Sequence, residues 1–362
     1  MENDIIQYLA LTIQHEGSDL HLCVGSQPMA RVHGNLVPLS DTVLDAETCR
    51  EMIYSIFTEN QRARFEETLE LDFALMVNNL GRFRGNANYS RGMVEATFRY
   101  IRDQIPTLDS LGLPPIVKQL CTLEQGIVIV TGATGSGKTT TLAAMVQEIN
   151  TRRSGVIISI EDPIEYIFAH NLSRVKQREI GTDTKTFAGA LRQALRQDPD
   201  VILVSEMRDL ETISTAITAA ETGHLVLATL HTIDAPKAID RIVDAFPPDQ
   251  QGQIVAQLGN CLQAIVAQRL LPRIDKAGRA LATEVMVMND AVRASLRDRR
   301  FQSILSMIEI GSKDGMMTFD ESVASLYAAG IIDREEALMN SRDSTRINSM
   351  KPATPKKKGF FS

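Results

Sequence analysis

Hydrophobic and polar positions follow two different patterns along the chain. In residues 1–100, apolar and polar side chains alternate in short runs, which is typical of strands with one buried face. The runs predicted as strands are 18–22, 71–75 and 94–100. Residues 45–67 between them carry apolar side chains at helical spacing. Residues 1–100 are therefore predicted to form an α+β domain.

Beyond a proline-bearing linker at residues 101–115, the apolar runs lose their polar alternation. Predicted strands are 126–130, 156–160, 201–204, 225–230 and 280–287, and predicted helices include one that follows the first of these strands, 187–195 and 213–220. From about residue 252, Ile254, Leu258, Leu262 and Ile265 recur at spacings of three and four, which predicts a helix. Strands apolar on both faces and interleaved with helices indicate a mainly parallel sheet. Residues 116–340 are predicted as an α/β domain.

Composition and charge narrow the class of protein. The length of 362 residues predicts roughly two domains, and a content of 44% hydrophobic residues is typical of a soluble globular protein. The net charge is −7, and the acidic start MENDIIQYLA is unlike a secretory signal, so a cytosolic protein is expected. No apolar run reaches the roughly 18 residues of a spanning helix. The last 22 residues hold six basic side chains and one acid, so 341–362 is predicted as a flexible basic tail, with membrane or partner docking as the alternative. The acidic remainder disfavours sequence-independent nucleic-acid binding.

A phosphate-binding loop is the strongest chemical signal. Residues 132–139 read GATGSGKT, a complete GxxxxGK[ST] motif that directly follows an apolar strand and opens a helix. Its glycines let backbone N–H groups turn toward phosphate oxygens at a helix N-terminus. The residues predicted to bind ATP are Gly132, Ala133, Thr134, Gly135, Ser136, Gly137, Lys138, Thr139 and Thr140. Lys138 is expected to reach the β- and γ-phosphates, and the Thr139 hydroxyl to bind Mg²⁺.

Acidic and histidine side chains adjoin three of the predicted strands. They are Glu161 and Glu165 after strand 156–160, Glu206 after strand 201–204, and His224 and His231 on either side of strand 225–230. Ligands bind beside the carboxyl ends of parallel strands. Hydrolysis needs a group that orients water. These residues are therefore candidates for the chemistry at the phosphate loop.

Longer motifs point to a family. The sequence contains GATGSGKTTTLAA, IEDPIEY, RQDPDVILVSEMRD and ETGHLVLATLHT. From about residue 17 to about residue 340 it resembles the secretion ATPase superfamily and, within it, the twitching-motility (PilT-type) pilus-retraction ATPases. The resemblance implies hexameric rings whose subunits pair a PAS-like N-terminal domain with a RecA-like ATPase domain. ATP is then expected between the two domains and at a subunit boundary.

The same resemblance assigns roles to single residues. Lys138 and Thr139 match the Walker A lysine and its magnesium-side hydroxyl. Glu165 matches the glutamate that polarises water, and Glu206 matches the Walker B glutamate, which is also expected near Mg²⁺, in part through water. His224 and His231 match the His-box pair. The family also uses arginines of the N-terminal domain to neutralise phosphates. The candidates are Arg82, Arg84, Arg91 and Arg99, among which the sequence does not choose. Arg82 and Arg84 are predicted to share one face of a strand.

Three further features bear on the branch of the superfamily. Extension and type II secretion ATPases carry a tetracysteine zinc insertion after the QRL segment, whereas here residues 268–280 contain no cysteine, which favours retraction. Ser205 stands where the family commonly has glycine before the Walker B glutamate, which puts the full catalytic rate in question. Residues 291–298 read AVRASLRD where retraction ATPases carry an AIRNLIRE-like motif.

The expected function is Mg²⁺-dependent ATP hydrolysis by a homohexamer at the cytoplasmic face of the inner membrane. The expected partners are a membrane platform protein of the pilus and a paralogous retraction ATPase. One alternative is an accessory retraction ATPase with weak activity. Another is a RecA-like nucleic-acid translocase, which the acidic charge disfavours, so that no nucleic-acid partner is expected.

Overall fold

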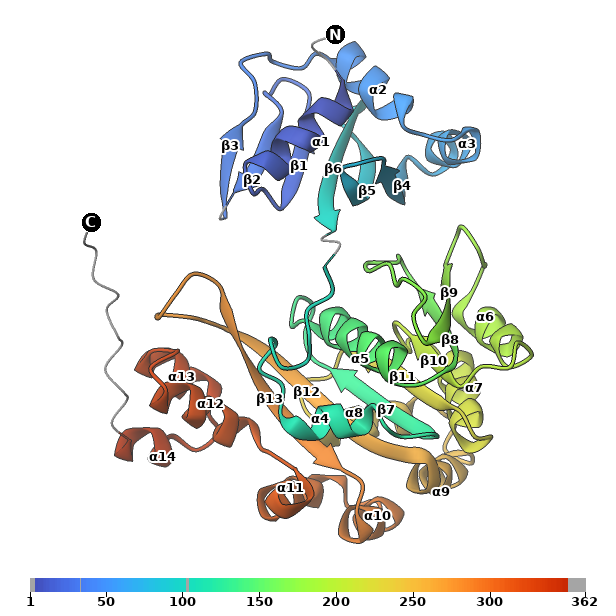
Figure 1. The fold of residues 1–362 in the computed structure, drawn as a ribbon, viewed down its shortest axis with the longest axis vertical. Helices are drawn as coiled ribbons and strands as arrows, with labels where there is room; N and C mark the ends of the chain where they lie inside the picture. Colours follow the sequence, from blue (N-terminus) through green and yellow to red (C-terminus); the bar gives the residue numbers. More distant parts are fainter. Residues whose placement is uncertain (1–3, 33, 102–103, 351–362) are drawn as a thin grey trace. The chain divides into compact units, whose positions relative to one another are not determined.

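The computed structural model describes residues 4–32, 34–101 and 104–350. The chain forms two compact units, the first made of Met1–Gln104 and Pro163–Ile167 and the second of Ile105–Asp162 and Phe168–Ser362 (Figure 1). Each unit has its own hydrophobic core. The short segment Pro163–Ile167 therefore belongs to the first unit, although its flanks belong to the second.

The first unit is a six-stranded antiparallel sheet with helices. Its strands, in sheet order, are β3 (Asn35–Pro38), β2 (Met29–Val32), β1 (Asp19–Leu22), β6 (Met93–Ile101), β5 (Gly81–Ser90) and β4 (Glu70–Val77). The helices are α1 (Ile5–Gln14), α2 (Ala46–Ser55) and α3 (Glu59–Thr68). Thr58 starts α3 with a capping box, and this break divides the helical stretch predicted at 45–67. Phe65, Phe83 and Phe98 are fully buried in the core.

The second unit contains a seven-stranded sheet that is parallel except at one edge. The strands, in sheet order, are β13 (Arg279–Val287), β12 (Leu262–Pro272), β7 (Gly126–Thr131), β11 (Leu225–Leu230), β10 (Val201–Val204), β8 (Gly155–Glu161) and β9 (Ser173–Glu179). The edge strand β13 runs antiparallel to β12, and the other neighbouring pairs are parallel. The predicted α/β class with a mainly parallel sheet is confirmed.

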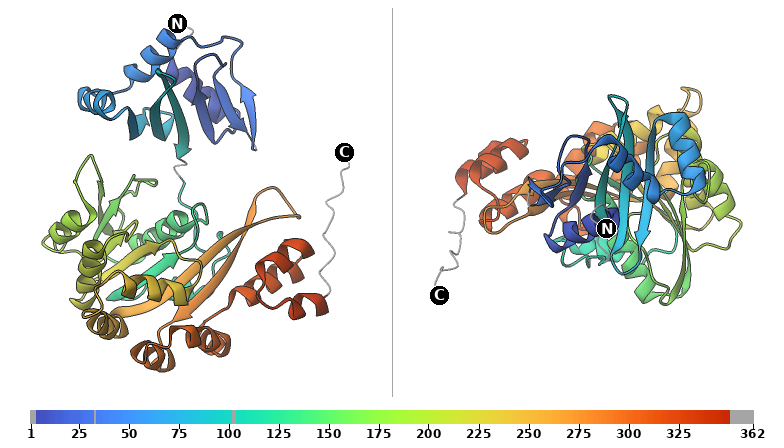
Figure 2. Two further views of the ribbon diagram at one scale, coloured as in Figure 1. Left: turned by 180° about the vertical axis from the view of Figure 1, so that it is seen from behind. Right: turned by 90° about the horizontal axis from the view of Figure 1, so that it is seen from above.

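Helices cover both faces of this sheet (Figures 1 and 2). α4 (Pro115–Leu120) packs on α5 (Lys138–Arg152), which lies against β7, β8 and β11. The opposite face shares one hydrophobic core with α6 (Phe187–Ala194), α7 (Leu210–Glu221), α8 (Ala235–Asp244) and α9 (Gln251–Cys261). α10 (Asp290–Arg297) and α11 (Ile304–Ile310), with the 3₁₀ turns η1 (Phe301–Ser303) and η2 (Ser312–Asp314) beside them, extend that layer.

The predicted helix after residue 252 is wrong at its end. α9 stops at Cys261, and Leu262 begins β12, where residues up to Ala267 pair with β7. Ile265 is fully buried inside the sheet rather than on a helix face. A short apolar run is buried on all sides in either structure, so the spacing of Leu262 and Ile265 could not distinguish them.

The C-terminal part forms a smaller helical layer beside β12 and β13. It consists of α12 (Phe319–Ala328), α13 (Arg334–Asn340) and α14 (Ser344–Ser349). α14 lies in the segment predicted as a flexible tail, and its Ile347 is 1% exposed because it packs into the cluster around Phe319. Residues 351–362 of that predicted tail lie outside the described residues.

Candidate active site

The phosphate-binding loop connects β7 to α5 as the motif predicts. Gly132, Gly135 and Gly137 have φ values of 149°, 78° and 90°, which side chains with a Cβ rarely adopt. A Cβ on Gly132 would lie 2.5 Å from both the Gln268 carbonyl oxygen and Ser136 Oγ. Gly137 starts α5 without a side-chain cap. The N-terminus of α5 thus carries no capping side chain where an anion would bind, which is the arrangement of phosphate sites.

Two polar side chains of the loop are buried inside it. Lys138 is 8% exposed, and its Nζ donates to the carbonyl oxygens of Gly132 at 2.9 Å and Ala133 at 3.1 Å. Ser136 Oγ is buried without a hydrogen-bond partner among the described residues. A buried hydroxyl usually has a partner, because leaving it without one costs free energy. The loop therefore offers an ammonium group and a spare hydroxyl for a phosphate ligand.

Glu206 lies at the carboxyl end of β10 and contacts an arginine and a histidine. Arg208 Nε lies 2.7 Å and His231 Nε2 lies 3.1 Å from the same Glu206 Oε1. Partial burial raises the pKa of Glu206, but the Arg208 and His231 interactions outweigh it and leave that pKa below its ordinary value. The carboxylate is therefore ionised at neutral pH. The three side chains line a cavity of about 390 Å³.

Threonines tie the loop after β11 to the strand that enters the phosphate loop. Thr131 Oγ1 donates to the Thr232 carbonyl at 2.7 Å, and Thr232 N donates to Thr131 Oγ1 at 2.9 Å. Thr232 follows His231, and Thr131 precedes the loop glycine Gly132. The structure thereby holds the His231–Glu206 pair and the phosphate loop on one edge of the sheet.

Ser205, the departure before Glu206, keeps its backbone in the sheet. Its N–H donates to the Ile160 carbonyl at 3.0 Å, and its own carbonyl accepts from the Thr229 hydroxyl. Both neighbouring strands therefore hold the residue that precedes Glu206.

The acidic segment after β8 divides between the two units. Glu161 is 3% exposed, and its Oε1 accepts from Ser159 Oγ at 2.6 Å and from Gln177 Nε2 at 3.1 Å. Gln177 Oε1 in turn accepts from Phe168 N at 2.9 Å. Gln177 on β9 thus binds both flanks of the segment Pro163–Ile167, which carries Glu165 into the first unit.

The candidate arginines all lie in the first unit, but not together. Arg84 pairs directly opposite Arg99 in the β5–β6 ladder, and Arg82 is on the same face of β5, opposite to the fully buried Phe83. Arg99 Nε forms an ion pair with Asp19 Oδ1 at 2.8 Å. Arg91 has φ 52° in the turn between β5 and β6, at the other end of the hairpin. The structure therefore gathers Arg82, Arg84 and Arg99 and separates Arg91 from them.

His224 does not lie with the Glu206 cluster. It precedes β11, whereas His231 follows it, and six strand residues separate them by roughly 20 Å. His224 Nδ1 lies 2.9 Å from the Ala219 carbonyl and 3.2 Å from Thr222 Oγ1. These contacts close the C-terminus of α7 (Leu210–Glu221), so in this chain the residue acts as a helix cap.

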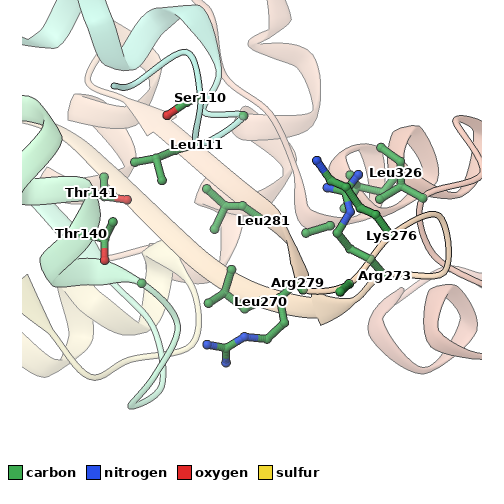
Figure 3. A pocket seen from close by; sticks show the side chains of 16 residues that line it. Ser110, Leu111, Thr140, Thr141, Leu270, Arg273, Lys276, Arg279, Leu281 and Leu326 are labelled. Atoms are coloured by element: carbon green, nitrogen blue, oxygen red, sulfur yellow. The ribbon is translucent and has the colours of Figure 1, made fainter. Parts of the chain in front are cut away.

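A second cavity, also of about 390 Å³, lies beside the start of α5 (Figure 3). Thr140 and Thr141 line one side, Leu270 and Leu281 lie in the middle, and Arg273 and Lys276 lie on the other side. The cavity is part apolar and part cationic. Gly137 of the phosphate loop also lines it, so the cavity adjoins the expected phosphates.

Arg208 and Gln177 are functional candidates that the sequence reasoning missed. Arg208 is only two residues after Glu206, and that proximity was an available signal. Gln177 is eleven residues from the nearest motif, IEDPIEY, and only the β8–β9 pairing brings it there. Within the described residues, no three histidine, cysteine, aspartate or glutamate side chains gather into a metal site. In the same residues, no helix is long and apolar enough to cross a membrane.

Comparison with known proteins gives the family. A model of the type II/IV secretion system protein family matches residues 104–331. The chain belongs to this family. It is 43% identical over 345 residues to the type IV pilus retraction ATPase PilT of Pseudomonas aeruginosa, a match that covers 95% of this chain and 98% of that protein. It is also 42% identical to the type IV pilus ATPase PilU of the same organism, over 94% of this chain and 90% of the relative.

Solved structures agree with this assignment. A crystal structure of the pilus retraction motor PilT with bound ADP matches 96% of this chain and 99% of its own, with 44% identity and a TM-score of 0.89. The ATPase DotB of Legionella pneumophila matches with 27% identity, covers 92% of this chain and 94% of its own, and has a TM-score of 0.79. The predicted fold and the predicted resemblance to retraction ATPases are confirmed, and the chain is an ATPase of this family.

Proposed function

We propose that this ATPase is a Mg²⁺-dependent motor that retracts type IV pili as a homohexamer. The observation that carries the proposal is a phosphate loop with its own buried lysine beside the Glu206–His231 pair, in a chain that matches PilT along nearly its full length. Its partners would be a pilus platform protein of the inner membrane and a paralogous retraction ATPase. It would act at the cytoplasmic face of that membrane.

The residues of the second unit divide into binding and orienting groups. The N–H groups of 132–140 and Lys138 would bind the phosphates, with Ser136 Oγ as a further donor. The cavity beside Thr140 and Leu281 would take the base. Glu206, which Arg208 and His231 keep ionised, would accept a hydrogen bond from a metal-bound water or from the attacking water. His231 would sense whether a γ-phosphate is present.

The residues fit Mg²⁺ bound as in other phosphate-loop enzymes. Thr139 supplies a hydroxyl beside the loop, and Glu206 supplies an ionised carboxylate at the end of β10, which is separated from β7 by β11. Mg²⁺ in such sites takes few protein ligands and keeps water and phosphate oxygens, which agrees with the lack of a carboxylate cluster among the described residues. When bound, the ion neutralises negative charge on the phosphates.

The first unit would supply the water-orienting group and the mobile charge. Residues 1–100 would act as a small domain, joined by the linker 101–115 to the ATPase domain 116–340. Glu165 lies in a segment that belongs to the first unit, so the glutamate and the arginines Arg82, Arg84 and Arg99 would move together. Their approach to ATP in one part of the cycle, and their withdrawal after hydrolysis, would convert chemical energy into movement.

Replacement of Glu165 by glutamine tests this proposal. Glutamine keeps the size of the side chain and removes its charge, so ATP binding should persist while turnover falls roughly 10²-fold. Binding is measured with a fluorescent ATP analogue and turnover by phosphate release. In cells, deletion of the gene should give surface pili in excess and no twitching. Unchanged turnover would remove Glu165 from its role, and bald cells would contradict retraction.

An accessory motor is the second candidate, because the identity to PilU is nearly that to PilT. The distinguishing measurement is ATP hydrolysis by the purified chain without any paralogue. Robust hydrolysis would favour the main motor. So would restored retraction when this chain alone is expressed in cells that lack both it and its paralogue. Hydrolysis that needs the paralogue would favour the accessory role.

A further inference from the structure

An arginine of the C-terminal segment reaches the start of α8 from more than a hundred residues away. Arg342 Nη2 lies 2.9 Å from Asp234 Oδ2, and Arg342 Nη1 lies 3.9 Å from Glu284 Oε2. Both carboxylates are buried, with side chains 8% and 0% exposed, whereas the arginine is 41% exposed. A single, partly exposed guanidinium thus pairs with two buried acids.

Both acids are occupied in holding the first turn of α8. Asp234 caps the helix, with its Oδ1 accepting from Lys237 N at 2.9 Å. Glu284 reaches from β13, and its Oε1 accepts from Ala235 N at 3.0 Å. Its Oε2 is buried without a hydrogen-bond partner among the described residues, and Arg342 Nη1 forms an ion pair with this oxygen.

Arg342 affects the charge state of Glu284. Burial raises the pKa of Glu284 above its ordinary value, while the Ala235 N–H and Arg342 limit the rise, as does Arg269 more weakly, and Asp234 adds to it. Removal of Arg342 takes away a charge that lowers this pKa, so the buried carboxyl becomes more costly to keep ionised. Loss of Arg342 should therefore loosen the N-terminus of α8.

The backbone of the C-terminal segment delivers the guanidinium to this place. Asp320 at the start of α12 accepts from Arg342 N through Oδ1 at 2.7 Å and from Asp343 N through Oδ2 at 3.1 Å. α14 then anchors the chain through the buried Ile347. The arginine is thus fixed at its backbone on both sides, unlike a freely rotating surface side chain.

A short loop, residues 231–234, connects the carboxyl end of β11 to the start of α8. Asp234 is three residues after His231, which contacts Glu206, and two after Thr232, which is bonded to Thr131 before the phosphate loop. A movement of the Asp234 cap would shift the short loop 231–234 on which both contacts depend. Small displacements of reacting groups lower rates strongly.

We propose that Arg342 is a positioning residue for ATP hydrolysis, which holds Asp234 and Glu284 so that the loop 231–234 presents His231 to Glu206. The catalytic consequence rests on the role proposed above for His231. The claim that Arg342 holds the loop 231–234 does not depend on the role of His231, so a separate experiment tests it.

Hydrogen exchange tests the holding of the loop. Arg342→Ala should increase amide exchange in peptides that cover residues 231–240, while Arg346→Ala should leave them as in the parent. Arg346 is a matched control on α14, because it is similarly exposed and pairs only loosely with Glu321 at 3.8 Å. Unchanged exchange in Arg342→Ala would overturn the proposal whether or not His231 takes part in catalysis.

Steady-state kinetics test the consequence for the reaction. Arg342→Ala should lower kcat on the order of tenfold with little change in KM, Arg342→Lys should recover part of the rate, and Arg346→Ala should match the parent. In a His231→Ala background, Arg342→Ala should add little further loss. The positioning role would be overturned if the kcat losses of Arg342→Ala and His231→Ala multiplied in the double variant. It would also be overturned if Arg342→Ala had a normal kcat although its amides at 231–240 exchanged faster. Should His231→Ala itself be normal, the function proposed for His231 fails instead, while the exchange result still stands.

If Arg342→Ala does not fold, Asp234→Asn provides the second variant. Asparagine keeps the oxygen that caps Lys237 N but loses the charge that pairs with Arg342. The same increase in exchange at 231–240 and the same fall in kcat are expected. A parent-like result in both measurements would reject the proposal.

Discussion

The two edges of the parallel sheet use the same kinds of polar residue in opposite ways. At the amino edge, Asp200 Oδ2 accepts from Val156 N at 2.7 Å and His224 closes the end of α7. At the carboxyl edge, Glu206 contacts both Arg208 and His231, and the three side chains line a cavity. Side chains at the first edge complete the backbone hydrogen bonding, whereas those at the second leave a site for a ligand.

The difference follows from chain direction. In a parallel sheet all strands end at one edge, where helices begin and their N–H groups are unpaired. At the other edge, helices end and expose carbonyl groups that side chains such as His224 can satisfy. Two histidines thus have different environments because one precedes a strand and the other follows it. Substitutions at the carboxyl edge should therefore impair hydrolysis, whereas matched substitutions elsewhere should not.

Lys138→Ala should abolish hydrolysis, with a loss of about 10³-fold or more, because the charge that we propose faces the phosphates disappears. Nucleotide affinity should also fall, since the lysine acts in the bound state as well. Phosphate release and binding of a fluorescent ATP analogue measure the two effects. The matched control is Lys118→Ala, which removes a partly exposed lysine of α4 that pairs with Asp109 and should retain parent activity. Comparable loss in both variants would place the effect outside the carboxyl edge.

Glu206→Gln should lower kcat by roughly 10²-fold and leave ATP affinity nearly unchanged, because the amide keeps the shape but cannot carry the negative charge. Single-turnover and steady-state phosphate release measure the effect on kcat, and equilibrium binding measures the effect on ATP affinity. Asp200→Asn is the matched change at the amino edge, and there kcat should be normal. Weak binding with an intact kcat in Glu206→Gln would contradict a role in the chemical step.

Much of the second unit could be predicted from the sequence because its signals are local. The apolar runs at 126–130, 201–204 and 225–230 correspond to β7, β10 and β11. The spacing of the glycines was enough to locate the phosphate loop. Glu206 at a strand's carboxyl end was predictable from the same rule. Leu262 and Ile265 were misassigned to a helix, since burial on all sides removes the periodicity that separates the two structures.

Other parts of the site depend on long-range pairing, which no local pattern records. Arg84 meets Arg99 because of the β5–β6 register, and Gln177 meets Glu161 because β9 lies beside β8. Arg342 lies 108 residues from Asp234 and in a stretch without periodicity. For the same reason the sequence favoured a flexible tail where α14 packs through Ile347.

The two histidines around β11 give a direct comparison of the edges. His231→Ala should lower kcat roughly tenfold, because Glu206 loses one of its two hydrogen-bond partners. His224→Ala should leave kcat unchanged and instead lower the free energy of unfolding by about 1 kcal/mol, since the C-terminal cap of α7 is lost. Phosphate release and urea unfolding of both variants check this. A catalytic defect in His224→Ala with normal stability would refute the assignment of that residue to the cap.

Arg208→Ala should have the smallest effect, and the effect should depend on pH. The folded-state pKa of Glu206 lies below its ordinary 4.5, so its pairing contributes stability above pH 4.5 that is lost as pH falls through the folded pKa. Arg208 is 68% exposed, so its removal should cost less than about 1 kcal/mol at pH 7. The gap in unfolding free energy between the parent and Arg208→Ala should therefore close as the solution is acidified below pH 4.5.

In a Glu206→Gln background the same substitution should show no such pH dependence, because the titrating carboxylate is absent. Urea unfolding at pH 7 and at successively lower pH measures the gap, and a gap that persists or widens in acid would mean that Arg208 stabilises the carboxyl edge through contacts other than Glu206.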